Sequence, residues 1–289
     1  QAKFYGMHWW GEVDKKHDRT VRPIIGNQAD ELAAIAGFQT YSEGETGTVI
    51  GVTAPKIDEF LSTQEFIKYL HDAALWHCWP KLVSEDKTTG ASPEMNFIFS
   101  DNGKKIDPVH PSEHPGIKPF VVAFQNAQDF QNQNNAPIWY ESQKNVLGHL
   151  GLNKFLSSDF PSGEKGQPIQ APCRHVALMR APNLVVEYKQ YDPHYEANLS
   201  WAGVFKVVDD SEKDKIFQNA EPPAHDQWMT NPPPGETKRI IENILNKIRQ
   251  EINSFISPSR NRDYESDDSL GRLAHLLGGL FVSVQGTKP

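Results

Sequence analysis

Leu184–Tyr191 reads Leu-Val-Val-Glu-Tyr-Lys-Gln-Tyr, a run of β-branched and aromatic residues that favours a β-strand. Side chains two residues apart in a strand lie on one face, so Glu187 and Lys189 point to the same side. His175–Arg180 predicts a second strand before this one, and Trp201–Val208 predicts a third after it. We expect these three strands to form an antiparallel meander.

Helices are predicted before and after these strands. Apolar residues recur at three- to four-residue steps from Asp58 to Cys78, with Ser62 placed as an N-cap and Trp79-Pro80 predicted to end the helix. An Ile-rich stripe runs from Ile240 to Ile256 after a Pro-rich segment. The elements together predict an α+β fold: a central mixed or antiparallel sheet with flanking helices and a C-terminal helical appendage.

Three parts are expected along the chain. Residues 1–57 hold a short helix near residues 29–36 and a glycine-rich turn at Gly44 that runs into a strand. Residues 58–230 form an α+β middle domain, and residues 231–289 form a Pro-rich linker with C-terminal helices, the last from Leu270 to Leu280. The chain begins Gln1-Ala2 without Met, so we expect it to be a piece of a longer protein.

Composition excludes several classes of protein. The chain has 289 residues, 38% of them hydrophobic, and a formal net charge of -8 at pH 7. Net acidity gives no support to a nucleic-acid partner, because neutralising phosphates needs dense Lys and Arg, although a local basic groove stays open. No apolar run reaches the length of a membrane span, so we expect no membrane partner. Cys78 and Cys173 fit no zinc spacing, and we expect reduced thiols and a cytoplasmic location.

Glu187 and Lys189 supply the Glu-x-Lys half of a Mg²⁺-dependent nuclease motif of the PD-(D/E)xK type. Phosphodiester hydrolysis of this type uses carboxylates to hold Mg²⁺ and a lysine to assist the attacking water. Asp159 is the candidate upstream carboxylate. This hypothesis requires the three side chains to share one cleft; otherwise Glu187 and Lys189 form a surface ion pair.

Two histidine patterns are further candidates. His225 beside Asp226 has the residue types of a general base with an orienting acid, but neighbours in a chain rarely face each other, so a packed turn is favoured. His110 and His114 have the spacing of metal ligands on a helix, which Pro111 excludes. We expect no metal ion and no cofactor in this chain.

Short motifs in the first 80 residues suggest a family. They are Phe4-Tyr5-Gly6, Trp9-Trp10-Gly11, Arg22-Pro23-Ile24-Ile25-Gly26 and Glu45-Thr46-Gly47-Thr48-Val49-Ile50. They resemble the trailing part of a GHKL-type ATP-binding domain, the class of histidine kinases, Hsp90, MutL and gyrase B. In that class a late Gly-Thr pair enters the closing strand, and a helix, here Gln64–Pro80, leads into a second α/β domain. His175–Trp228 resembles the same large bacterial proteins, some of which act in phage defence.

This resemblance implies a region that follows the nucleotide-binding motifs. The Asn-bearing helix that holds Mg²⁺ in the class and its Asp-x-Gly-x-Gly loop have no match in this sequence. The resemblance therefore implies a trailing ATP-binding-like lobe in residues 1–57. Residues 58–230 would be a non-catalytic, transducer-like domain that couples nucleotide state to other domains or subunits. ATP and Mg²⁺ would then bind elsewhere in the parent protein. In this class a lysine of the second domain can reach the γ-phosphate of ATP, and the candidates here are Lys81, Lys104, Lys154 and Lys189.

Two other functions stay open. One is the nuclease that uses Asp159, Glu187 and Lys189. The other is a protein-interaction module that docks through the Ile-rich helix, although an exposed stripe of that size is a liability and we expect it to pack inside.

Overall fold

The computed structural model describes residues 11–13, 21–38, 41–42, 44–52, 62–83, 95–106, 109–161, 166–191, 198–229 and 235–256. The chain divides into two compact units, Gln1–Glu59 and Phe60–Pro289. The aromatic motifs before Gly11, most of the Pro-rich linker and the predicted last helix from Leu270 lie outside the described residues.

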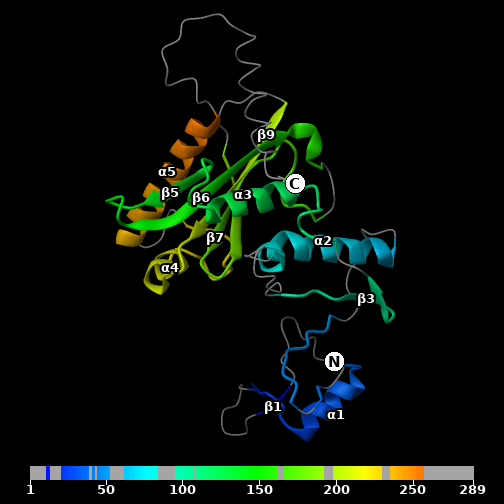
Figure 1. The fold of residues 1–289 in the computed structure, drawn as a ribbon. Helices are drawn as coiled ribbons and strands as arrows, with labels where there is room; N and C mark the ends of the chain where they lie inside the picture. Colours follow the sequence, from blue (N-terminus) through cyan, green and yellow to red (C-terminus); the bar gives the residue numbers. More distant parts are fainter. Residues whose placement is uncertain are drawn as a thin grey trace, which may run out of the picture. The chain divides into compact units, whose positions relative to one another are not determined.

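The first unit contains one short hairpin and one helix in its described residues (Figure 1). Strand β1 (Glu12–Val13) pairs antiparallel with β2 (Val21–Arg22), and α1 (Asn27–Ile35) is followed by Gly37 at φ 79°, a backbone conformation suited to glycine. The predicted helix is confirmed. The strand predicted after Gly44 is not formed, because no described segment pairs with residues 45–52, and Ile50 is 85% exposed.

The second unit is built on a five-stranded mixed sheet (Figure 1). Its strands are β5 (Asn135–Trp139), β6 (Val146–Leu156), β7 (Arg174–Arg180), β8 (Leu184–Gln190) and β9 (Leu199–Val207), in the spatial order β5-β6-β9-β7-β8. Strand β9 runs parallel to β7, and the other neighbouring pairs are antiparallel. The predicted α+β class with a central mixed sheet is therefore confirmed.

The order of the last three strands differs from the predicted meander. β7 and β8 form the expected hairpin, but β9 lies between β6 and β7 instead of beside β8. The physical reason is burial: every residue of β9 except Lys206 is buried. A strand without a polar face needs a neighbour on each side and cover on both faces. Strand β8 carries Glu187 and Lys189, which suit an edge.

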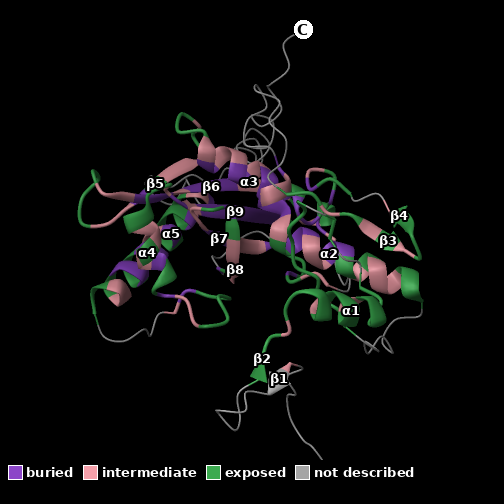
Figure 2. Ribbon diagram, turned by 90° about the horizontal axis from the view of Figure 1, so that it is seen from below, coloured by how far each residue is buried: buried purple, intermediate pink, exposed green. Residues whose placement is uncertain are grey.

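Helices cover both faces of the sheet (Figure 2). Helices α2 (Thr63–Leu82) and α3 (Lys118–Gln128) pack on one face, and α4 (Ser211–Gln218) and α5 (Glu236–Ile256) pack on the other. The second unit also has a small hairpin, β3 (Phe99–Asp101) and β4 (Lys104–Ile106), joined at Asn102-Gly103. The result is a three-layer arrangement with one apolar cluster on each side of the sheet.

Helix α2 has the predicted N-cap, Ser62, and ends later than predicted. The Ser62 side chain accepts a hydrogen bond from the Glu65 N–H at 3.1 Å, which caps the first turn. The helix continues through Pro80 to Leu82, so the predicted end at Trp79-Pro80 was wrong.

A contact from the sheet explains how Pro80 is tolerated. Proline has no N–H, so the carbonyl of Trp76, four residues earlier, lacks its usual helical donor. The Tyr188 hydroxyl of β8 donates to that carbonyl at 2.5 Å and accepts from Trp79 Nε1 at 2.9 Å. A side chain from another element thus completes the last turns of α2.

The apolar stripe of α5 packs inside, as expected. One face of this helix lies in the same apolar cluster as Trp201, Phe205 and Phe217. The buried residues of the stripe are Ile240, Ile241, Ile244, Leu245, Ile248, Ile252 and Ile256. Because α5 contributes to this core, its stability depends on the sheet beneath it.

We predict that Ile248→Ala lowers the free energy of unfolding by about 2–5 kcal/mol, because it removes buried methyl groups and leaves a cavity. Chemical denaturation followed by circular dichroism measures this loss. The matched control is Asn246→Ala on the exposed face of the same helix, which should change stability by about 0.5 kcal/mol or less. Equal losses for both variants would mean that α5 is not docked through its stripe.

Candidate functional site

Glu187 and Lys189 lie on the edge strand β8 and pair with each other. Lys189 Nζ is 3.3 Å from Glu187 Oε1. Glu187 is opposite Leu178 and Lys189 is opposite Val176 in the β7–β8 register. Leu178 and Val176 belong to the apolar cluster that includes α5. Both charged side chains therefore lie on the sheet face that α5 covers.

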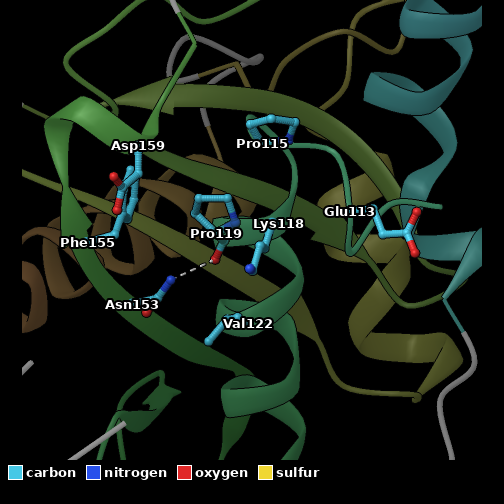
Figure 3. Close-up of a pocket in the computed structure, with 8 residues that line it drawn as sticks. All are labelled: Glu113, Pro115, Lys118, Pro119, Val122, Asn153, Phe155 and Asp159. Atoms are coloured by element: carbon cyan, nitrogen blue, oxygen red, sulfur yellow. Dashed lines mark hydrogen bonds between the residues drawn. The ribbon is translucent and has the colours of Figure 1, made fainter. Parts of the chain in front are cut away.

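Asp159 lies on the other face. It ends the short 3₁₀ helix Ser157–Asp159 after β6, and it lines a cavity of about 330 Å³ together with Lys118 and Val122 of α3. Figure 3 shows Asp159 and Glu113 at opposite sides of this cavity, with Lys118 between them. These carboxylates are not arranged as a pair.

The three predicted nuclease residues therefore do not converge. Strands β9 and β7 lie between β6 and β8, which separates them by about 14 Å at ordinary strand spacing. Asp159 also faces α3, whereas Glu187 and Lys189 face α5. The hypothesis required one shared cleft, and the sheet itself divides its residues. This corrects the predicted site of Asp159, Glu187 and Lys189.

Other charged and polar side chains lie on the same face of the sheet as Glu187 and Lys189. We call this group the α5-face cluster, and it consists of Lys154, Arg174, Glu187, Lys189, Tyr191, Trp201 and Arg249. Its centre is a row across the sheet: Lys154 of β6 is opposite Trp201 of β9, which is opposite Arg174 of β7. The Tyr191 N–H then donates to the Arg174 carbonyl at 2.9 Å.

Helix α5 completes the cluster from above. Arg249 Cζ is 5.9 Å from the centre of the Tyr191 ring. Lys154 Nζ is 4.4 Å from the centre of the Phe255 ring, a cation–π contact. Four cationic side chains from the sheet and from α5 thus belong to a cluster that includes one carboxylate, that of Glu187.

Several polar atoms of the cluster are buried without a hydrogen-bond partner. Among the described residues, six buried side-chain atoms have none, and four of them lie here: Arg174 Nε, Glu187 Oε2, the Tyr191 hydroxyl and Trp201 Nε1. Buried polar groups are nearly always paired, and each exception in a folded protein requires an explanation. Because these four atoms lie on one face of the sheet, we take this cluster as the candidate site.

Burial determines the protonation of two members. It raises the pKa of the Tyr191 phenol; the Arg249 guanidinium lowers this pKa and the Glu187 carboxylate raises it, each by less. Tyr191 therefore keeps its proton and is available as a donor at neutral pH. Burial also lowers the pKa of Lys154, so an anion nearby would favour its charged form.

The histidine candidates have structural partners. His225 pairs through Nδ1 with Glu221 at 2.8 Å instead of with Asp226, and the buried Glu221 carboxylate also contacts Arg180 at 3.5 Å. His110 and His114 each accept a backbone N–H two residues ahead, which stabilises turns. In the described ranges, no three His, Cys, Asp or Glu side chains gather closely enough to hold a metal ion.

The cysteines are not part of this site. Cys78 and Cys173 are free cysteines in the described part of the chain. Burial raises the pKa of Cys173 to about 12, so at neutral pH it is a protonated, poorly reactive thiol.

Comparison with family models, with curated proteins and with solved structures finds no match for the chain. Among the helices that the structure describes, none has the length and apolar composition needed to cross a bilayer.

Tyr188 of β8 and Tyr191, the residue after its end, face opposite sides of the sheet and provide a direct test of which buried hydroxyl has a partner. We predict that Tyr188→Phe lowers the free energy of unfolding by about 1–3 kcal/mol, because Trp79 Nε1 and the Trp76 carbonyl lose their partner. Tyr191→Phe should leave stability within about 0.5 kcal/mol of the wild type, since its hydroxyl has no partner to lose among the described residues. Thermal and denaturant unfolding measure both. A large loss for Tyr191→Phe would mean that its hydroxyl is bonded in the folded chain.

Proposed function

We propose that the chain is a non-catalytic, transducer-like region of a multidomain GHKL-type ATPase, and that bacterial anti-phage defence is its setting. In this role it couples the nucleotide state of the parent protein to the binding of other domains or subunits. The observation that carries the proposal is the α5-face cluster: it combines an excess of cations with buried donors that have no partner in the described residues, as a contact for a phosphate requires.

The lysines support this assignment. The resemblance to GHKL-type proteins leaves four lysines as candidates for contact with a γ-phosphate. Two of them, Lys154 and Lys189, lie in the α5-face cluster, where Arg174 and Arg249 accompany them. The other two lie on α2 and on the β3–β4 hairpin. The first pair belongs to the cluster; Lys189 and Arg174 lie on neighbouring strands, whereas Lys154 lies on the far side of Trp201.

The composition of the cluster favours binding over turnover. Glu187 is its single carboxylate, and Lys189 already neutralises one of its oxygens. Asp159, which would have supplied a second carboxylate, faces α3. A group of cations and neutral donors can hold a phosphate and report its presence, whereas a general base would need a free acceptor aimed at a water molecule.

The chain lacks the nucleotide-binding motifs of the class, so we predict that it contacts ATP through the terminal phosphate alone and does not hydrolyse ATP above the rate of a buffer blank. Lys189→Gln should weaken ATP binding about tenfold, because it removes one charge-assisted contact to phosphate. Calorimetric titration measures binding, and a phosphate-release assay measures turnover. The matched control is Lys215→Gln on α4, an exposed lysine paired with Glu212, which should bind ATP as the wild type does.

Either of two results would contradict the proposal. ATP turnover that copurifies with the chain and disappears in Lys189→Gln would show catalysis. Absence of ATP binding in the wild type would remove the basis for coupling to a nucleotide.

A further inference from the structure

We infer that the α5-face cluster is a binding site for a hydrogen-phosphate group, that is, a tetrahedral phosphate that still carries an O–H. This inference deepens the proposed function and rests on it for the origin of the phosphate. The donors, the charge and the single carboxylate of the cluster each point to this ligand.

The charge of the cluster calls for an anion. Lys154 and Arg174 flank the buried Trp201 in neighbouring strands, and Arg249 approaches from α5. Lys154 and Arg174 are partly removed from water, where like charges repel each other more strongly than in bulk solvent, whereas Arg249 is exposed. Glu187 offsets one of these charges. A dianion would offset most of the remainder.

The neutral donors point to a ligand with several acceptor oxygens. Trp201 Nε1 donates only, and its side chain is completely buried. The Tyr191 hydroxyl keeps its proton because burial raises its pKa, and Tyr191 is 4% exposed. Together with Arg174 Nε, these are three donors with no acceptor among the described residues. A carboxylate offers two oxygens, whereas a phosphate offers four in a tetrahedral array that can meet donors from several directions.

Glu187 selects among the tetrahedral anions. Its Oε1 faces Lys189, and its Oε2 is buried without a partner in the described part of the chain. An ionised carboxylate only accepts, so a fully deprotonated anion such as sulfate would place oxygen against oxygen there. Hydrogen phosphate carries an O–H that donates to Oε2 while its other oxygens accept. The carboxylate therefore favours phosphate over sulfate, although both have similar size and charge.

The O–H that Glu187 requires also distinguishes inorganic phosphate from a phosphate monoester. Near pH 7 inorganic phosphate retains one O–H, whereas a phosphate monoester, whose second pKa is about 6, has lost its proton. We therefore assign free inorganic phosphate as the preferred ligand, and the terminal phosphate of ATP, which lacks this proton, should bind the same cluster less tightly. In a parent ATPase inorganic phosphate would be the product released by hydrolysis, so this site would respond to turnover elsewhere in the protein.

The test is a calorimetric titration of the full chain at about pH 7.5, above the second pKa of a monoester, in a buffer free of phosphate and sulfate. The four ligands are inorganic phosphate, sulfate, AMP and ATP. We expect one phosphate per chain, bound about tenfold or more tighter than sulfate, which corresponds to one hydrogen bond to a charged group. AMP should bind less tightly than inorganic phosphate. No phosphate binding, or equal binding of phosphate and sulfate, overturns the inference.

Two substitutions test separately which residue selects phosphate over sulfate and which residue contributes to the affinity for both anions. Glu187→Gln replaces an acceptor-only group by an amide that also donates, so the preference for phosphate over sulfate should fall to about threefold or less. Arg249→Gln should weaken the binding of phosphate and of sulfate about tenfold each, so the preference for phosphate should remain. Lys215→Gln on α4 is the control and should match the wild type. Wild-type selectivity in Glu187→Gln would overturn the role of the carboxylate.

Tyr191→Phe keeps the test decisive if a charge variant fails to fold. It removes one buried hydroxyl without changing charge, and it should weaken phosphate binding about tenfold while the unfolding midpoint without ligand stays the same. Unchanged phosphate affinity in this folded variant counts against the site.

The results also distinguish this inference from the proposed function. Phosphate binding without ATP binding would support the hydrogen-phosphate site and contradict the proposed coupling to nucleotide state. ATP binding without phosphate binding sustains the coupling role and overturns the hydrogen-phosphate site. ATP turnover contradicts only the non-catalytic assignment.

Discussion

The Tyr188 hydroxyl fills the gap that Pro80 leaves in helix α2. Its bonds to the Trp76 carbonyl and to Trp79 Nε1 join the edge strand β8 to the helix that packs beside it. The ring completes the contact, with its centre 5.5 Å from that of Trp76 and 5.2 Å from that of Phe120 on α3. Burial raises the pKa of Tyr188, so the hydroxyl remains a donor. One side chain therefore holds three elements in place.

This contact also determines where the candidate site lies. Side chains alternate along a strand, so anchoring Tyr188 toward α2 and α3 directs Glu187 and Lys189 toward α5. A shift of β8 by one residue would exchange the two sets, placing charges in the core and the tyrosine in the cluster. The buried tyrosine on one face and the ion pair on the other thus support a single register.

Local signals in the sequence predicted much of the fold. The periodic stripe of α5 and the Ser62 cap of α2 each depend on residues close together in the chain, and each is present. The central position of β9 depends on which strands compete for the middle of the sheet. The apolar sequence of β9 indicates that the strand is buried, but it does not indicate which strands pair with it. Passage of α2 through Pro80 depended on a tyrosine more than a hundred residues away.

The candidate site was predicted only in part, for a related reason. Glu187 and Lys189 stood out because they are two residues apart. Lys154, Arg174 and Arg249 join them from three other elements, so no spacing in the sequence connects them. Asp159 was paired with Glu187 because it precedes it at a suitable distance along the chain. The sheet, which the sequence analysis placed at the centre of the fold, is what separates the two.

The position of β9 has a consequence for how the protein is made. Strand β9 is the last of the five strands to leave the ribosome, yet it occupies the middle of the sheet. Until residues 199–207 emerge, β5–β6 and β7–β8 are two hairpins with unpaired edges and no strand to join them. Docking of α5 must wait as well, because the surface it covers includes β9. The candidate site therefore assembles only late in synthesis, when three distant parts of the chain meet.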